Sequence, residues 1–376
     1  MRIPSPLLEQ LVAAQSNLFG EEFKTAFQFV ARVLDDLKVA SPTPKELGDQ
    51  QAEAVADLDC TELVTFWSKI VRQSNVPRHA IPNHAVSLAQ HAQLLRAFSD
   101  PATAVEQIRV KVAAVVQGFP REATDIECGR NPGDILDPYI LAATQYLVCG
   151  GDFSGAIEHT VSHKTLMMIE GLLGHLHEDV IGLMRGNVRV PEPRGKDQET
   201  ISPESNPFPG ADLVQPPWDK SRSLRFQQIK SKTGSAKGGD GRRLGEQLQR
   251  LRDLYGGDIF YHALIGNTLR GHRSKGGVER AAEDVVVLVG ESSFRELTGS
   301  NQGPQLLLRV YQAAFQEVAD ESGYTLDSVA AGIVETFRQR SEDSGEGFLE
   351  TMLEAAIGGP ASQQDNRMFG RSRPQR

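Results

Sequence analysis

The sequence predicts an α/β (α+β) fold, in which a small mixed central sheet is flanked by helices and follows a large helical N-terminal region. Two patterns indicate this. Apolar residues recur at helical spacing before residue 150, as in Phe23, Phe27 and Val30. Between residues 162 and 290, a long apolar helix precedes short strand-like runs. The predicted order there is helix, strand, strand, strand, helix, strand, strand, which suits a sheet covered by helices.

The predicted elements follow from periodicity and from the proline or glycine residues at their ends. Helices are predicted over residues 63–71, 85–98, 103–116, 139–148, 162–184, 242–254, 305–320 and 326–340. Strands are predicted over residues 185–190, 211–214, 223–230, 259–265 and 285–289. The last strand is entirely apolar, which is typical of a strand buried on both faces. We expect a helical N-terminal region over 1–155, a core with C-terminal helices over 156–345, and a partly disordered tail over 346–376.

The composition is that of a globular protein. The chain has 376 residues, of which 39% are hydrophobic and 24% charged. Its apolar runs are far shorter than the roughly 20 residues that a membrane helix needs, so no membrane segment is expected. Three cysteines without metal-ligand spacing predict a reducing, cytoplasmic location and no disulfide framework.

Positive charge is concentrated in one part of this acidic chain. The formal net charge is −9, yet residues 219–253 hold ten Lys or Arg against four Asp or Glu. The stretch 270–277 adds three more basic residues. Such a local excess favours binding of phosphate groups, as on a DNA backbone. The alternative interpretation is a solvated basic face.

Two predicted strands in this region carry residues suited to phosphodiester hydrolysis. Asp212 lies in a short apolar strand, and Gln228 and Lys230 alternate with Ile229 in the next one. Alternate strand residues face opposite sides, so Gln228 and Lys230 share a face while Ile229 enters the core. If the strands are neighbours, Asp212, Gln228 and Lys230 converge. A carboxylate that holds a divalent metal, beside a lysine that orients water or steadies phosphate charge, suits this reaction.

The order of elements, with Asp on the second strand and Gln-x-Lys on the third, resembles the PD-(D/E)XK nuclease superfamily. The resemblance covers residues 160–290, and within the superfamily the chain is similar to type II restriction endonucleases, the ApaLI-like group among them. It implies a Mg²⁺-dependent nuclease core, with Asp212 as a metal ligand and Lys230 at the attacking water or scissile phosphate. The chain departs from the pattern at Ala211, where proline is usual, and at Gln228, where an acid is usual.

Gln228 leaves the site short of one negative charge, because an amide offers a metal only a neutral oxygen. Two glutamates are candidates for the missing acid. Glu246 lies in the helix predicted after the third strand, and Glu170 lies in the apolar stretch of the long helix. Asp212, Gln228 and Glu170 are the expected metal ligands. A purely structural role stays open for each of these three residues and for Lys230 and Glu246. Such a residue would be a turn residue, a solvated side chain or an ion-pair partner instead of a metal ligand or catalytic group.

The same region supplies the residues expected to contact DNA. Small residues in 231–239 let backbone N–H groups approach phosphates, but the spacing is not that of a nucleotide-binding GxxxxGK[ST] loop. The candidates for phosphate or base contacts are Lys232, Thr233, Lys237, Arg242, Arg243, Arg270, Arg273 and Lys275.

Four histidines near the long helix do not have the spacing of a zinc site. His159, His163, His175 and His177 lack a tight zinc motif and are expected on helix surfaces or between helices.

These observations and the resemblance predict a Mg²⁺-dependent, site-specific endonuclease of the type II restriction kind, acting on double-stranded DNA in a prokaryotic cytoplasm. A short palindromic target implies a homodimer in which each subunit cuts one strand. Two alternatives stay open. One is a modification-dependent or repair nuclease with the same core. The other is a non-catalytic DNA-binding protein with a decayed nuclease site, which Gln228 permits.

Overall fold

The computed structural model describes residues 3, 5–127, 138–191, 208–217, 223–232, 240–266, 273–322, 326–345 and 348–349. The chain forms two compact units. The first comprises residues 1–108 and 174–312, and the second comprises residues 109–173 and 313–376. Because compact units need not coincide with sequence domains, the domain boundaries predicted at residues 155 and 345 stay a prediction.

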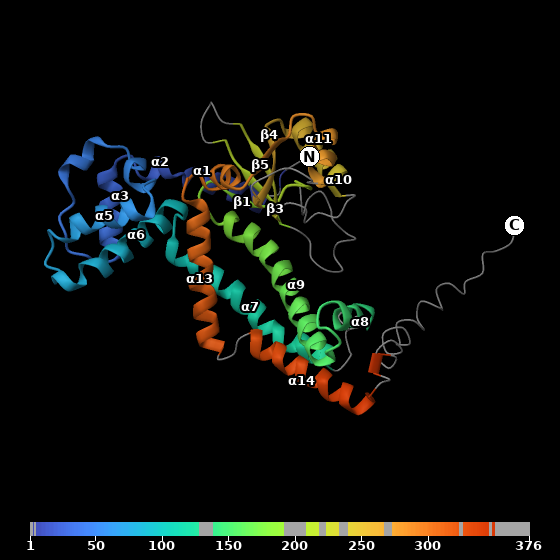
Figure 1. Ribbon diagram of the computed structural model, residues 1–376. Coiled ribbons are helices and arrows are strands. Elements are labelled where there is room, and N and C mark those ends of the chain that lie inside the picture. Colours follow the sequence, from blue (N-terminus) through green and yellow to red (C-terminus); the bar gives the residue numbers. More distant parts are fainter. Residues whose placement is uncertain are drawn as a thin grey trace. The chain divides into compact units, whose positions relative to one another are not determined.

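The first unit begins with a cluster of helices (Figure 1). These are α1 (Ser5–Ser16), α2 (Phe19–Glu22), α3 (Ala26–Asp36), α4 (Glu53–Ala56), α5 (Cys60–Val71) and α6 (Ile81–Ala97), with short 3-10 helices at Lys45–Asp49 and Arg78–Ala80. α3 and α5 each start with a capping box, formed by Thr25 with Gln28 and by Asp59 with Glu62. Their apolar faces meet in a core that includes the fully buried Trp67.

The sheet of the first unit has five strands in sequence order. They are β1 (Val188–Arg189), β2 (Leu213–Gln215), β3 (Arg225–Lys232), β4 (Asp258–Ile265) and β5 (Val286–Val289). The β1–β2 and β2–β3 pairs are antiparallel, and the β3–β4 and β4–β5 pairs are parallel. The prediction of a mixed sheet inside an α and β fold is therefore confirmed. The order of helix, three strands, helix and strand is also as predicted, but the helix α11 (Arg273–Ala281) then precedes β5, where two consecutive strands were predicted.

The burial of β5 differs from the prediction. β5 lies at the edge of the sheet, and Val286 is 42% exposed. The strand buried on both faces is β4, of which six of eight residues are buried. An all-apolar run of four or five residues therefore did not distinguish an edge strand from a central one. The position of a strand in the sheet depends on which other strands pair with it, and the run itself does not specify those partners.

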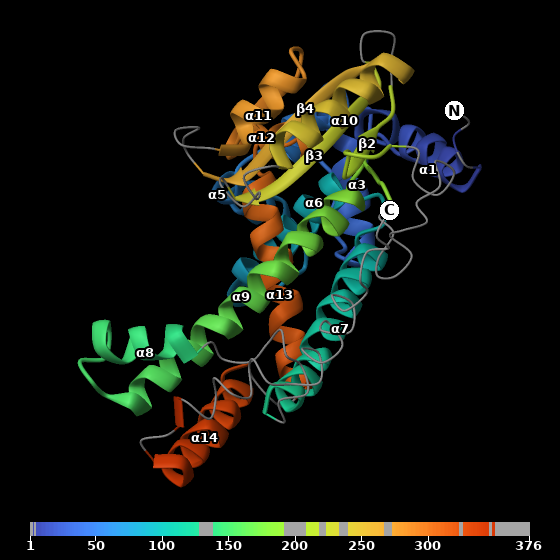
Figure 2. The ribbon, with the colours of Figure 1, turned by 90° about the vertical axis from the view of Figure 1, so that its right-hand side faces the viewer.

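Helices cover both faces of the sheet. On one face, α1, α10 (Asp240–Tyr255) and α11 (Arg273–Ala281) pack on Val214, Phe226 and Tyr261. Figures 1 and 2 show α10 and α11 alongside the sheet. On the other face lie the end of α9 (Phe153–Gly182) and α12 (Glu291–Thr298). The contact with α9 is close: a Cβ at Gly182 would lie 2.8 Å from the Cβ of Arg189.

The second unit is helical in its described part. It contains most of α7 (Pro101–Glu127), most of α9, α8 (Pro138–Leu147), the end of α13 (Gly303–Ser322) and α14 (Leu326–Ser344). Leu141, Ile157 and Phe337 belong to its core. None of the helices in the described residues combines the length and the apolar character needed to cross a membrane. The predicted tail lies, apart from residues 348–349, outside the described residues.

Candidate functional site

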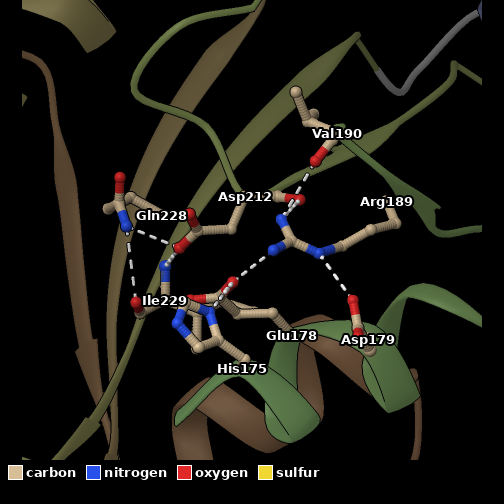
Figure 3. Close-up of polar contacts among 8 residues, drawn as sticks. All are labelled: His175, Glu178, Asp179, Arg189, Val190, Asp212, Gln228 and Ile229. Atoms are coloured by element: carbon tan, nitrogen blue, oxygen red, sulfur yellow. Dashed lines mark hydrogen bonds and ion pairs between the residues drawn. The ribbon is translucent and has the colours of Figure 1, made fainter. Parts of the chain in front are cut away.

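Asp212 and Gln228 meet at the junction of β2 and β3 (Figure 3). Gln228 Nε2 donates a hydrogen bond of 2.5 Å to Asp212 Oδ2, and the Ile229 backbone N–H donates one of 2.6 Å to the same oxygen. The register explains the meeting, because Leu213 lies opposite Gln227 and Asp212 precedes Leu213. Asp212 is 5% exposed and Gln228 3% exposed. The structure thus brings together the two polar residues that the sequence placed on neighbouring strands.

Lys230 follows on the same face of β3 as Gln228, as alternation requires. Its side chain is partly buried, whereas Ile229, on the opposite face, is 2% exposed. No acidic side chain in the described residues forms a salt bridge with Lys230.

Gly210 lets α10 approach the Asp212 segment closely. It has φ +97°, a conformation that side chains other than glycine rarely adopt. A Cβ at this position would lie 2.5 Å from the Cβ of Gln247 in α10. The helix after β3 therefore packs directly against the turn that positions Asp212.

An arginine that was not predicted as a site residue links the Asp212 segment to α9 (Figure 3). Arg189 Nη1 donates to the Asp212 carbonyl at 2.8 Å and to the Val190 carbonyl at 3.1 Å. Arg189 Nε donates to Asp179 Oδ1 at 3.2 Å, and Nη2 donates to Glu178. One guanidinium thus joins two acids of α9 to the backbone that carries Asp212, a task for which its fixed fork of donors is well suited.

Of the two glutamates predicted to replace the missing acid, neither is seen at Asp212. Glu246 is exposed and accepts a 2.8 Å hydrogen bond from Arg242, one turn earlier in α10. No described contact joins it to Asp212. Glu170 lies in α9, but its side chain is outside the described residues. The acids of α9 that are linked to the Asp212 backbone, through Arg189, are Glu178 and Asp179, and Glu178 follows Glu170 by about 12 Å of helix rise.

The predicted DNA-contacting residues are described only in part. Arg242 and Arg243 are exposed at the start of α10, and Lys275 is partly buried in α11 next to Glu279. Lys232 and Arg273 end β3 and begin α11, but their side chains are outside the described residues. Thr233, Lys237 and Arg270 lie outside the described residues altogether.

The histidines of α9 pack or face solvent, as expected. His177 Nδ1 lies 3.0 Å from the Tyr311 hydroxyl of α13, and burial lowers the pKa of His177 to about 4. His159 and His163 are exposed. Within the described part of the chain, no three histidine, cysteine or acidic side chains gather as a metal site would require.

The donor atoms at Asp212 fit a metal that needs few protein ligands. They are the Asp212 carboxylate, the Gln228 amide and the Ile229 carbonyl, which lies 3.4 Å from Gln228 Nε2. A 180° turn of the Gln228 amide would present Oε1 in place of the N–H group that now faces Asp212. Mg²⁺ commonly binds one or two carboxylates, with water and substrate phosphate completing its shell. The set is thus compatible with Mg²⁺ only with such additional ligands.

A second polar cluster lies on the opposite face of the sheet. Gln227 Nε2 donates to Gln215 Oε1 at 3.0 Å, and Gln227 Oε1 lies 2.6 Å from Nε2 of the fully buried His262. Gln215 in turn donates to Asn187 at 2.8 Å, and Arg225 is paired with Glu296. This cluster connects β2, β3 and β4 with the residue before β1, on the face of the sheet opposite Gln228 and Lys230.

Comparison with known proteins adds no assignment: the chain matches no protein-family model and no curated protein.

Proposed function

We propose that the protein is a Mg²⁺-dependent endonuclease that hydrolyses double-stranded DNA at a specific site, in the manner of a type II restriction enzyme. The observation that carries the proposal is the contact of Asp212 with Gln228 on neighbouring strands, with Lys230 two residues further along the same face. Asp212 and Gln228 supply oxygen ligands, and Lys230 supplies a cation. The helix that packs against this turn, α10, begins with the exposed Arg242 and Arg243.

The residues of the chain have separate tasks in this proposal. The β-sheet fixes Asp212 through its backbone, since Asp212 N–H donates to the Gln227 carbonyl at 2.8 Å and Val190 N–H donates to the Asp212 carbonyl at 2.9 Å. Lys230 places its ammonium group against the scissile phosphate, where it stabilises the negative charge that develops during attack by water. Arg189 holds Asp212 in place from the backbone side.

Mg²⁺, when bound by Asp212, Gln228 Oε1 and the Ile229 carbonyl, would supply the polarisation of the phosphate and lower the pKa of an attacking water. A single carboxylate makes this a weak metal site in the absence of DNA. We expect the substrate phosphate to complete it. Because a palindromic site presents the same chemistry on both strands, two copies of the chain would act together, one on each strand.

The test is incubation of the full-length protein with plasmid DNA of known sequence, in Mg²⁺ and separately in EDTA. The proposal predicts discrete fragments in Mg²⁺ and intact DNA in EDTA, and fragment ends that map to one short sequence. Heterogeneous fragments would reduce the proposal to a non-specific nuclease. Binding of DNA with no cleavage in any of Mg²⁺, Mn²⁺ and Co²⁺ would contradict it.

One observation favours a second candidate, a DNA-binding protein whose nuclease site has decayed. Asp212 Oδ2 accepts two N–H donors, from Gln228 and from Ile229. These hydrogen bonds satisfy that oxygen without a cation. The same plasmid experiment separates the candidates, because a decayed site retains DNA binding and has no Mg²⁺-dependent product. A modification-dependent nuclease would instead cut only methylated plasmid, so the plasmid is tested in both forms.

A further inference from the structure

A cavity of about 510 Å³ lies in the first unit, away from Asp212, where the N-terminal helices meet α12. Residues of α2, α4, α6, β2 and α12 contribute to its wall. Its charged and polar lining side chains are Glu21, Glu53, Arg96, Arg185, Gln215, Arg295, Glu296 and Thr298. A cavity of this volume is in the range of small-molecule sites. The proposal above gives no task to these residues.

Arg185 is a buried cation with an unused donor. Its side chain is 4% exposed. Nε donates to the Leu95 carbonyl at 3.1 Å, and Nη1 donates to the Asn17 carbonyl at 3.0 Å and to Glu22. Its Nη2 has no hydrogen-bond partner in the described part of the chain. Burial lowers the pKa of Arg185 and the Glu22 carboxylate opposes this, so an anion in the adjoining cavity would stabilise the charged side chain.

Two residues of α6, Arg96 and Gln93, contribute further donors to this region. Arg96 is held by Asp57 at 2.9 Å and by the Gly299 carbonyl at 2.7 Å, and its guanidinium lies 4.3 Å from the centre of the Phe19 ring. Gln93 Nε2 is buried and lacks a hydrogen-bond partner among the described residues. It lines a small adjoining cavity whose wall also includes Arg96. Buried N–H groups in this state require acceptor atoms from a ligand or water.

The other walls offer acceptors and an apolar surface. Glu53 is partly buried and Glu21 exposed, so both can accept hydrogen bonds from hydroxyl or amino groups. Leu18 and Leu297 contribute apolar surface. A matching ligand therefore combines an anion for the arginines with hydrogen-bond donors for the glutamates, and is larger than an inorganic phosphate. A nucleoside phosphate has all of these features.

We infer that this cavity binds a nucleotide, with its phosphate at Arg185, Arg96 and Arg295 and its sugar or base amino groups at Glu53. The site is distinct from the proposed cleavage site. Gln215 is three residues beyond Asp212 in an extended strand, which corresponds to about 10 Å, and it faces the opposite side of the sheet. The nucleotide has two possible sources, a free mononucleotide or one nucleotide of a DNA strand.

The inference is tested by titrating the full-length protein, in EDTA, with each deoxynucleoside 5′-monophosphate, with inorganic phosphate and with an unmodified DNA duplex, using calorimetry. EDTA prevents cleavage, so the result does not depend on the proposed nuclease activity. At least one mononucleotide is expected to bind about tenfold or more tightly than inorganic phosphate, because only the nucleotide reaches Glu53. If duplex DNA competes with the mononucleotide, the natural occupant is a nucleotide of DNA. If the mononucleotide binds equally well in the presence and absence of duplex DNA, the natural occupant is a free nucleotide.

Arg185→Lys is the direct variant, but Arg185 also holds the fold together. Arg295→Gln is therefore the principal one, because Arg295 is 62% exposed in its side chain and its partner is Glu291 in the same helix. Arg295→Gln should weaken nucleotide binding about tenfold, the effect of one charge-assisted hydrogen bond. The control, Arg338→Gln, removes an arginine of α14 that pairs with Glu335 and should bind normally. The inference is overturned by absence of nucleotide binding, by equal affinity for inorganic phosphate, or by unchanged binding in Arg295→Gln.

Discussion

Lys230 is the residue whose side chain chemistry the proposed reaction needs most. It leaves the same face of β3 as Gln228, and none of the acidic side chains in the described residues neutralises it. Lys230→Ala removes the cation that steadies the charge developing on the phosphate. We expect cleavage of plasmid DNA in Mg²⁺ to fall about 100-fold or more, with DNA affinity in Ca²⁺ changed less than about threefold, as measured by gel shift.

The matched control is Lys69→Ala, which removes an exposed lysine from α5. It should cleave as the unmodified protein does. Normal cleavage by Lys230→Ala would show that another residue supplies the cation.

Gln228 decides how much negative charge the site holds. Its amide now donates to Asp212 Oδ2 at 2.5 Å. Gln228→Glu would replace this hydrogen bond by two carboxylates in contact, which repel each other unless a proton or a cation lies between them. In EDTA we expect a loss of stability of about 1–2 kcal/mol, measured by urea denaturation at pH 7.5. In 10 mM Mg²⁺ or Ca²⁺ the loss should become smaller, because the cation binds only the folded carboxylate pair.

Gln228→Ala is the comparison, since it removes the hydrogen bond without adding charge. Its stability should not respond to divalent cations more than that of the unmodified protein. If Gln228→Glu and Gln228→Ala respond equally to Mg²⁺, the second carboxylate does not complete a metal site, and the role of Gln228 is structural.

The convergence of Asp212 and Gln228 could be predicted because both are fixed by local rules, namely strand alternation and the pairing of strands close in sequence. The link through Arg189 could not. Arg189 contacts Glu178 and Asp179 across a turn and Asp212 across a strand pair. A basic residue in a short strand next to two acids at a helix end is a common pattern, and nothing in the sequence states which backbone the arginine will reach.

At the level of elements, the pairing of α10 with α11 depends on glycine at the contact. A Cβ at Gly245 would lie 2.7 Å from the Val278 carbonyl and 2.8 Å from the Ala281 Cβ. Alanine is favoured over glycine inside a helix by about 1 kcal/mol, but overpacking costs about 1–3 kcal/mol. We therefore expect Gly245→Ala to lower the free energy of unfolding, as measured by urea denaturation.

A helical glycine without this constraint provides the control. A Cβ at Gly174 in α9 would have no atom within 4 Å other than its own helix and chain neighbours. Gly174→Ala should keep or raise stability, by up to about 1 kcal/mol. If both substitutions have the same effect, α10 and α11 do not pack as closely as described.

Two buried histidines, His262 in the polar cluster of the sheet and His177 in α9, predict a dependence of stability on pH. Burial lowers the pKa of His262 to about 3 and that of His177 to about 4, so both are neutral in the folded protein. In the unfolded chain they bind a proton near pH 6.5. Their contribution to stability is therefore complete above pH 6.5 and is lost as the pH falls from 6.5 toward 3. Each histidine should contribute a slope of about 1.4 kcal/mol per pH unit in this window.

Urea denaturation of the unmodified protein and of His262→Gln, at pH values from 7.5 to 5, measures this contribution. The variant should have lower stability at pH 7.5, because it loses packing against Phe260, and a smaller slope below pH 6.5. A slope identical in both proteins would mean that His262 is not kept neutral by burial.

The elements themselves were predictable where local signals are strong. β4 and α10 appear within one or two residues of their predicted ends, since turns with glycine or clear periodicity bound them. α11 and α12 were not predicted. α11 contains Gly276 and Gly277, which disfavour a helix in isolation, and Gly277 allows it to pack closely on the start of α10. Tertiary packing, rather than propensity, determines such a helix.

For the molecule as a whole, charge limits where DNA would bind under the proposed function. A chain with a net charge of −9 repels DNA at long range, so affinity has to come from local positive potential. In the described residues, Arg242 and Arg243 lie exposed at the start of the helix that packs on the Asp212 turn. The pairing of Arg242 with Glu246 is between exposed side chains and is therefore weak. A phosphate can replace the glutamate at little cost.

This location predicts how salt will affect binding. Each phosphate neutralised by a basic side chain releases counterions and contributes about −0.9 to the slope of log affinity against log salt concentration. Replacing Arg242 and Arg243 together by glutamine should therefore make the slope less negative by about 1.8, measured by fluorescence anisotropy in Ca²⁺ between 50 and 200 mM KCl. Arg338→Gln, in α14, removes positive charge elsewhere and should leave the slope unchanged. The slope is the quantity to measure because it counts phosphate contacts, whereas a lower affinity could also reflect a general loss of electrostatic attraction. An unchanged slope in the double variant would place the DNA on another surface.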